Sequence, residues 1–297
     1  MNVAVLAEPK SWYLADLVRA AGADYRVTPV SYRQLWAAVE PGAEQRAEVV
    51  GSGAVRLVDC DAVLLRSLPA GTLEQVIFRL DVLGRAEAAG CLVMNPPRAV
   101  EAAVDKYLAT ARLAAAGLPV PRTWVCESPG DALAGFESLG GDVVVKPLFG
   151  SEGRGLMRLT DRVLAERAFA ALAQIGAIYY LQEFVPHEGH DLRALVIGDE
   201  LLAMRRSNPH DWRTNVRLGA TAESLELPAE LQALARKAAA AVGAPLAGVD
   251  LLPGRDGLVR VIEVNAVPGW KALAAAHQTD VARRVLDFLS ARRRGRV

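Results

Sequence analysis

The chain has 297 residues, 52% of them hydrophobic, which predicts two or three folded subdomains around a large core and excludes a disordered protein. Lysine and arginine total 34, as do aspartate and glutamate, so the net charge is zero and no overall field attracts nucleic acid. With no apolar run of membrane-spanning length, no signal-peptide pattern and three scattered cysteines (Cys60, Cys91, Cys126), we expect a cytoplasmic protein with reduced thiols and no membrane partner.

The first part of the chain alternates strand and helix patterns. Short apolar runs predict strands at Asn2–Leu6, Tyr25–Pro29, Ala62–Leu65 and Cys91–Met94, and helical periodicity predicts helices at Ser11–Ala21 and Leu73–Ala89. This alternation predicts an α/β fold with an open, mostly parallel sheet. The first turn, A-E-P-K, lacks the glycine fingerprint of a dinucleotide site, and Asn95-Pro96-Pro97 marks a boundary.

The rest of the chain mixes helices and strands without a repeat. Helical patterns predict helices at Ala99–Ala103, Lys106–Ala116, Glu230–Val242 and Asp280–Arg293. Strand patterns predict Thr123–Val125 and Val143–Pro147, then a strand pair, Tyr179–Val185 and Leu192–Ile197, and a hairpin partner, Leu201–Arg206. Two more short β runs contain Asp250 and Glu263.

The most informative segment is V-R-V-I-E-V-N-A-V-P-G-W, residues 259–270. It predicts a buried strand on which Glu263 and Asn265, two positions apart, leave the same face. Asp250 lies on the preceding β run and adds a third oxygen ligand. Carboxylate and amide oxygens suit Mg²⁺, which takes its remaining ligands from water and phosphate. The alternative is two buried strands with solvent-side acids at their ends.

A lysine followed by a glycine-rich loop predicts a phosphate site. Lys146 ends the apolar run V-V-V-K-P, and the loop G-S-E-G-R-G follows at residues 150–155. Burying an ammonium group is unfavourable unless an anion pairs with it, and glycines let backbone N–H groups approach phosphate. An ordinary hairpin loop is the alternative reading of the glycines. Lys106, which opens a predicted helix, reads by itself as a surface lysine.

Several basic side chains are predicted to gather near one end of the hairpin, where their guanidinium groups could hold phosphate and carboxylate. They and their neighbours are Asp191, Arg193, Arg205, Arg206, Arg213 and Asn215. A salt-bridged surface is the alternative. The apolar segment L-Q-E-F-V around Glu183 predicts either an adenine site or a plain core strand. His187 and His190 lack further partners for a metal site.

Six segments, in this order, resemble the ATP-grasp superfamily and, within it, the RimK-like α-L-glutamate ligases. They are D-K-Y-L-A-T, V-V-K-P-L-F-G-S-E-G-R-G, L-Q-E-F-V, D-L-R-A-L-V-I-G-D-E, W-R-T-N and V-I-E-V-N-A-V-P-G-W, and the resemblance covers Asn95 to Leu289. It implies an ATP-grasp fold with an N-terminal α/β domain (1–95), a central lobe (96–181) and a C-terminal lobe (182–297), ATP being gripped between the last two. The segment P-G-W-K-A-L is closer to members that glutamylate tetrahydromethanopterin.

The resemblance also implies a role for each matched residue. ATP phosphates would be held by Lys106, Lys146 and the loop residues Ser151, Gly153 and Gly155, adenine would be held by Glu183, Phe184 and Val185, and the ribose would be held by Asp191. The γ-phosphate and the reacting carboxylate would be held by Arg213, Thr214 and Asn215, with Arg193 nearby. Two Mg²⁺ ions, replaceable by Mn²⁺, would be held by Asp250, Glu263 and Asn265. Arg213, Arg193 and Asn215 are the expected catalytic residues.

The implied reaction is ADP-forming ligation through an acylphosphate, with L-glutamate added to the carboxylate of a small molecule or peptide. Three other readings stay open: another ATP-grasp peptide ligase, a small-molecule kinase on the same fold, and a nucleotide-binding module without turnover. The last is disfavoured by the complete set of lysine, aspartate, glutamate and asparagine. Self-association into a homo-oligomer also stays open.

Overall fold

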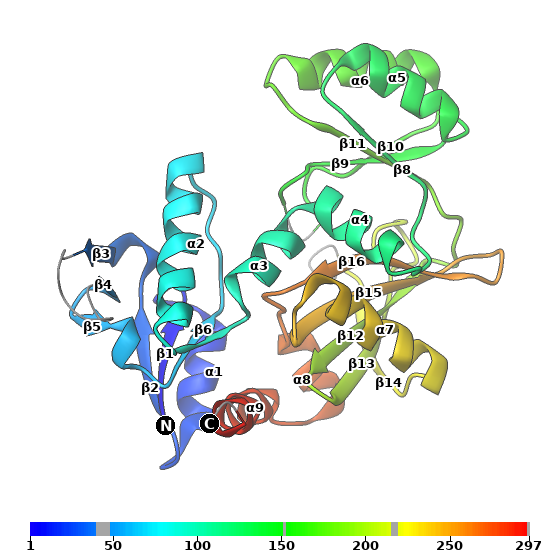
Figure 1. Ribbon diagram of the computed structural model, residues 1–297. Coiled ribbons are helices and arrows are strands. Elements are labelled where there is room, and N and C mark those ends of the chain that lie inside the picture. Colours follow the sequence, from blue (N-terminus) through cyan, green and yellow to red (C-terminus); the bar gives the residue numbers. More distant parts are fainter. Residues whose placement is uncertain (40–47, 151–152, 215–218, 296–297) are drawn as a thin grey trace.

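The computed structural model describes residues 1–39, 48–150, 153–214 and 219–295 of the chain (Figure 1). Its N-terminal unit is a four-stranded parallel sheet in the order β2-β1-β6-β7. The strands are β1 (Asn2–Leu6), β2 (Arg26–Val30), β6 (Ala62–Leu65) and β7 (Leu92–Met94), and the helices are α1 (Trp12–Ala21) and α2 (Leu73–Ala88). A small antiparallel sheet of β3 (Leu35–Val39), β4 (Glu48–Ser52) and β5 (Val55–Arg56), with the short helices η1 (Tyr32–Gln34) and η2 (Leu57–Asp59), completes this unit.

The middle of the chain forms a small lobe, at the top of Figure 1, with an antiparallel four-stranded sheet in the order β10-β9-β11-β8. Its elements are β8 (Thr123–Cys126), α5 (Pro129–Ser138), β9 (Val143–Lys146), β10 (Met157–Leu159), α6 (Arg162–Ala173) and β11 (Tyr179–Glu183). Both helices pack on one face of the sheet, where Phe169 and Tyr179 meet edge to face with ring centroids 5.6 Å apart. Burying these rings fixes the lobe as a unit.

A five-stranded antiparallel sheet, ordered β14-β13-β12-β15-β16, forms the base of the third unit. Its strands are β12 (His190–Ile197), β13 (Glu200–Ser207), β14 (Thr221–Leu225), β15 (Leu246–Pro253) and β16 (Val259–Asn265). The helices around it are α3 (Pro97–Val104), α4 (Lys106–Ala115), α7 (Ala229–Val242), α8 (Lys271–His277) and α9 (Val281–Arg294). Among the described residues, no helix is long and apolar enough to cross a membrane.

The two faces of this sheet have different partners. On one face, Leu192, Ala194 and Val249 pack under α4 and α7. On the other, Leu195 and Ile197 join α9 and the N-terminal sheet in a second core. Because successive strand residues alternate between faces, the second face also carries the polar side chains at the start of β12. The sheet therefore buries one end of this face and leaves polar groups for a site at the other.

The expected α/β fold is confirmed, with one wrong pairing. We expected residues 179–185 and 192–197 to form a strand pair, but β11 pairs with β8 and β9, while β12 pairs with β13 and β15. The connection contains Pro186, which has no N–H, and Gly189, which adopts φ +70°. These residues end the first sheet and carry the chain into the next lobe.

The unit boundaries at residues 95 and 181 remain a proposal. β11 extends to Glu183, just past the second boundary. Helices α3 and α4, which come before it in the chain, pack on β16 and α7 of the five-stranded sheet, as Figure 1 also shows. These two helices and the five-stranded sheet together form the base from which the small lobe extends.

Candidate nucleotide and metal site

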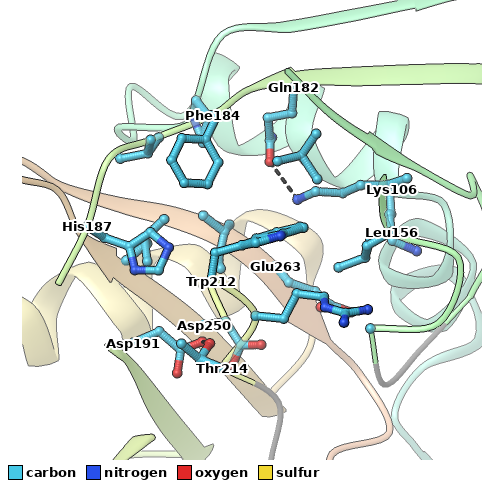
Figure 2. A pocket seen from close by; sticks show the side chains of 18 of the residues that line it. Lys106, Leu156, Gln182, Phe184, His187, Asp191, Trp212, Thr214, Asp250 and Glu263 are labelled. Atoms are coloured by element: carbon cyan, nitrogen blue, oxygen red, sulfur yellow. Dashed lines mark hydrogen bonds between the residues drawn. The ribbon is translucent and has the colours of Figure 1, made fainter. Parts of the chain in front are cut away.

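A pocket lies between the small-lobe sheet and the five-stranded sheet (Figure 2), with an empty volume of about 900 Å³ that includes its open mouth. Lys146 and Gln182 reach it from the small lobe, and Asp191, Asp250 and Glu263 reach it from the sheet below. The two walls thus present cations and acids to the same space.

The cationic wall is made by Lys146 and Lys106. Lys146 Nζ donates to Gln182 Oε1 at 2.6 Å, and Lys106 Nζ donates to the carbonyl of Gly150 at 2.9 Å. In the described part of the chain, neither ammonium lies within ion-pair distance of a carboxylate. Burial lowers the pKa of Lys106 and lowers that of Lys146 to about 8, although the Glu263 carboxylate opposes both shifts. Two half-buried cations that have no counterion in the described part of the chain favour an anion such as phosphate.

Lys146 gives a testable pH dependence. Its pKa is depressed, so the ammonium is charged below about pH 8 and loses its proton above it. Calorimetry should therefore show ATP affinity falling by up to about tenfold per pH unit above that value, with proton uptake on binding.

Lys146→Ala should weaken ATP binding about tenfold or more, which corresponds to about 1.4 kcal/mol or more. Lys146→Arg, which stays charged, should lose the pH dependence; an unchanged profile there would contradict this assignment.

The opposite end of the pocket is apolar. Val144, Val185, Leu252 and Ile262 line it, and together they form a slot for a flat ring. The backbone N–H of Val185 meets no protein acceptor among the described residues, so it is available to a ligand. The Glu183 carboxylate is used differently, since its Oε1 accepts from the backbone N–H of Arg122 at 3.0 Å. The expected adenine segment therefore offers its backbone rather than this side chain.

Below the pocket, a buried ion network links three strands. Arg206 binds Asp191 through two bonds, Nε–Oδ1 at 2.7 Å and Nη2–Oδ2 at 2.5 Å, and its Nη2 also lies 3.1 Å from Asp250 Oδ2. Arg193 Nη1 donates to Asp250 Oδ1 at 2.6 Å, and Thr214 Oγ1 donates to Asp191 Oδ2 at 2.6 Å. Burial opposes ionisation of Asp250, but the guanidinium groups of Arg193 and Arg206 hold its pKa below the ordinary value.

The expected metal ligands lie on adjacent strands. Asp250 and Glu263 are direct cross-strand partners, and Asn265 follows two residues after Glu263. The Glu263 carboxylate lines the pocket and has no hydrogen-bond or ion-pair partner among the described residues. No group of three or more His, Cys, Asp or Glu that could hold a metal occurs in the described ranges. The donors present, two carboxylates and one amide, fit Mg²⁺ only if phosphate and water complete its shell.

The remaining expected residues differ in how close they lie to the pocket. Arg213, Phe184 and Gly153 line the pocket, with Arg213 Nη2 bound to Asp211 Oδ2 at 2.6 Å. Arg193 and Asn265 lie just behind the lining, and Gly155, with φ +73°, packs on Pro147 in the loop. Ser151 and Asn215 are outside the described residues.

One expected member of the arginine cluster, Arg205, does not reach the site. Arg205 pairs with Leu192 across the sheet, on the face opposite Arg206, and its Nη2 lies 3.3 Å from His190 Nδ1. Strand alternation separates the two neighbours, so only Arg206 reaches the site.

Three residues that contribute to the site were not predicted from the sequence. Gln182 binds Lys146, and its signal was a polar residue beside Glu183 at the end of an otherwise apolar strand. Trp212 lies in the pocket near Phe184, with ring centroids 6.0 Å apart (Figure 2). Gly248 lies opposite Asn265 and had no sequence signal for its role, because that role depends on the strand beside it.

Gly248 makes room for Arg193. A Cβ at residue 248 would lie 2.5 Å from Arg193 Nη2 and 2.6 Å from its Cζ, inside a buried ion pair. Gly248→Ala should therefore displace the guanidinium, destabilise the fold by about 1–3 kcal/mol and lower turnover. Urea unfolding and ADP release would measure both effects. The control is Gly84→Ala on α2, whose Cβ meets nothing within 4 Å; equal behaviour of the two variants would contradict the packing argument.

Comparison with known proteins agrees with this geometry. Residues 103–289 match a family model described as a RimK-like ATP-grasp domain. The tetrahydromethanopterin:alpha-L-glutamate ligase of Methanosarcina acetivorans is 30% identical, over 96% of this chain and 97% of that protein. A probable alpha-L-glutamate ligase of Sodalis glossinidius is 35% identical over 80% of each chain. The solved structure of the ATP-grasp ligase PsnB, complexed with minimal precursor, Mg and ADP, gives a TM-score of 0.76 at 24% identity, covering 98% of this chain and 97% of that one.

Proposed function

This chain belongs to the RimK-like ATP-grasp family, and from that premise we propose that it joins the α-amine of L-glutamate to the carboxylate of an acceptor. The family assignment makes it an ATP-grasp ligase, and ligases of this fold use ATP and Mg²⁺. The products on the nucleotide side are ADP and phosphate.

One observation carries the proposal: Lys106 and Lys146, which have no carboxylate within ion-pair distance among the described residues, share one pocket with the carboxylate of Glu263, which has no hydrogen bond or ion pair in the same part of the chain. An anion alone would satisfy the lysines but would be repelled by the acid. Phosphate that arrives with a divalent cation satisfies both walls at once. A pocket that only held a metal would have no use for the two buried ammonium groups.

We assign each part of the pocket one task. Val185 donates its free backbone N–H to the adenine ring, which the apolar slot receives. Lys106 and Lys146 orient the phosphates, and Asp191 holds the ribose. Asp250, Glu263 and Asn265 hold Mg²⁺, two ions in our proposal and replaceable by Mn²⁺, which neutralises phosphate charge when bound. Arg213 leaves Asp211 for the γ-phosphate, and Arg193 keeps Asp250 ionised.

The reaction proceeds in two bond exchanges. An acceptor carboxylate oxygen attacks the γ-phosphorus and ADP leaves, so that an acylphosphate forms. The glutamate amine then attacks the acyl carbon, loses a proton and expels phosphate. Positive charge around the transferred group matters most in the first exchange. Exclusion of water by the two lobes protects the acylphosphate from hydrolysis.

The choice of substrate rests on relatives. The 30% identical protein from Methanosarcina acetivorans is named as adding glutamate to tetrahydromethanopterin, and the match covers nearly both chains. We therefore propose L-glutamate as the amine and a pterin cofactor of that type as the first acceptor to test. Peptides form the second set of acceptors to test, because PsnB is solved in complex with a precursor peptide. Self-association of the chain is left to measurement.

Isotope transfer tests the reaction type. Acceptor labelled with ¹⁸O in its carboxylate should pass one labelled oxygen to phosphate, seen by ³¹P NMR, and only when L-glutamate and ATP are both present. Label that stays in a persistent phosphorylated acceptor would show a kinase. AMP and pyrophosphate as products would show an adenylating ligase, and either result would overturn the proposal.

A further inference from the structure

The strand that carries Glu263 and Asn265 continues into residues 266–270, here called the 266–270 segment, and this segment is held by the N-terminal unit. Asn95, the residue after β7, is 1% exposed. Its Nδ2 donates to the carbonyls of Ala266 at 2.5 Å and Leu246 at 2.6 Å, and its Oδ1 accepts from the N–H of Leu246 at 3.1 Å. One amide thus ties the end of β16 to the start of β15.

Arg66, the residue after β6, holds the same segment further along. Its Nη2 donates to the carbonyl of Pro268 at 2.6 Å. The guanidinium lies 4.0 Å from the ring centroid of Trp270 and 4.9 Å from that of Tyr13. Trp270 is fully buried, and its Nε1 donates to Asp16 Oδ2 of α1 at 3.0 Å. The segment is therefore clamped between two neighbouring strand ends and α1.

Stability alone does not explain this arginine. Arg66 is 6% exposed and has no carboxylate partner in the described part of the chain, and its Nε and Nη1 meet no acceptor there. Burial lowers its pKa to about 10, so it remains charged at neutral pH. A buried guanidinium with unused donors is unfavourable compared with an apolar side chain of similar size. A positioning role for a neighbouring segment of the chain would explain a buried arginine of this kind.

We propose that Arg66, together with Asn95, is a positioning residue of the metal site. The link is direct: Asn265 Oδ1 accepts from the N–H of Val267 at 2.8 Å, so the amide of Asn265 follows the 266–270 segment that Arg66 and Asn95 fix. Partners behind a metal ligand commonly set its orientation and its affinity for the ion. The inference rests on the proposed function, because the metal role of Asp250, Glu263 and Asn265 is itself proposed.

The chain offers a matched control. Arg79 of α2 is also buried, donates Nη1 to the carbonyl of Pro69 at 2.6 Å and lies 5.7 Å from the ring centroid of Tyr32. It makes the same kinds of contact as Arg66, which binds one proline carbonyl and lies against two aromatic rings rather than one. Both of these contacts lie within the N-terminal unit, so the loss of Arg79 tests burial of an arginine without touching the 266–270 segment.

The test compares Arg66→Met, Arg66→Lys and Arg79→Met with wild type. Mn²⁺ affinity is measured by electron paramagnetic resonance of the free ion in the presence of ADP, and stability by thermal unfolding. Arg66→Met should weaken Mn²⁺ binding about 10–100-fold, while its Tm stays within about 3 °C of wild type. Arg66→Lys, which keeps one N–H for Pro268, should be intermediate, and Arg79→Met should bind Mn²⁺ like wild type.

Three outcomes would overturn the inference. Unchanged Mn²⁺ affinity in both Arg66 variants would make the residue structural, as would equal losses in Arg66→Met and Arg79→Met. A raised KM for glutamate or acceptor with normal Mn²⁺ affinity would make Arg66 a substrate contact. If the Arg66 variants bind Mn²⁺ normally, the Glu263→Gln variant shows which proposal has failed. Normal Mn²⁺ binding by Glu263→Gln as well would mean that the proposed metal site is wrong. Weakened Mn²⁺ binding by Glu263→Gln would mean that the metal site is right and only the role of Arg66 fails.

Discussion

Glu263→Gln should lower turnover about a thousandfold or more, a loss of about 4 kcal/mol in transition-state stabilisation. Glutamine keeps the shape of the side chain but removes the carboxylate that has no protein partner in the described structure. The loss should fall on turnover rather than stability, because no hydrogen bond or ion pair of the described fold depends on that carboxylate. ADP release at saturating ATP and Mg²⁺, together with thermal unfolding, would measure both.

A matched acid lies on the same hairpin. Asp256, between β15 and β16, is exposed and pairs with Arg260 at 2.6 Å, outside the pocket. Asp256→Asn should turn over like wild type. If Glu263→Gln did the same, the metal assignment would be rejected. A second sign should accompany the loss: because Glu263 raises the pKa of Lys146, its removal should shift the pH dependence of ATP binding to lower pH.

Arg213→Ala should lower kcat about 100- to 1000-fold while weakening ATP binding less than about fivefold. In this structure Arg213 is held by Asp211, and Asp211 in turn has a pKa lowered by that contact. In our proposal, this guanidinium, which lines the pocket, serves an anion that develops during the reaction. Its charge matters most as the γ-phosphoryl group is transferred, so kcat carries the effect.

Steady-state kinetics with separate ATP-binding calorimetry would test this split. Arg205→Ala is the control, because Arg205 precedes Arg206 on the same strand but faces away from the site. Similar losses in kcat for both variants would point to a general charge effect. A loss of ATP affinity as large as the loss of kcat would place Arg213 on the bound nucleotide instead.

Local patterns predicted most of the fold. The strand and helix alternation of the N-terminal unit and the strands around Lys146 and Glu263 occur where the apolar runs indicated. Helices α5 and α6 were missed, although both begin at cap residues: Ser128 Oγ accepts from the N–H of Asp131 and Asp161 Oδ1 from that of Leu164. The hairpin of β12 and β13 was predicted and is confirmed, but the pairing of β12 with β15 could not be predicted, because it depends on packing between segments far apart in sequence.

The candidate site was predictable only in part for a similar reason. Lys146 and Glu263 carried signals in their own segments, a lysine before a glycine loop and an acid two positions from an asparagine. Arg206 was predicted only as one member of an arginine cluster, because its own importance lies in reaching Asp191 and Asp250 on two neighbouring strands. The register between paired strands determines which side chains meet, and this register cannot be derived from a single sequence.

The packing of α9 has a consequence for synthesis on the ribosome. Val285 and Leu289 of α9 share a core with Val3, Leu17 and Leu64 of the N-terminal unit. Helix α1 packs on this face early in synthesis, but the part of the core that α9 completes stays exposed until α9 has left the ribosome. The nascent N-terminal unit therefore exposes apolar side chains for as long as the rest of the chain is being made.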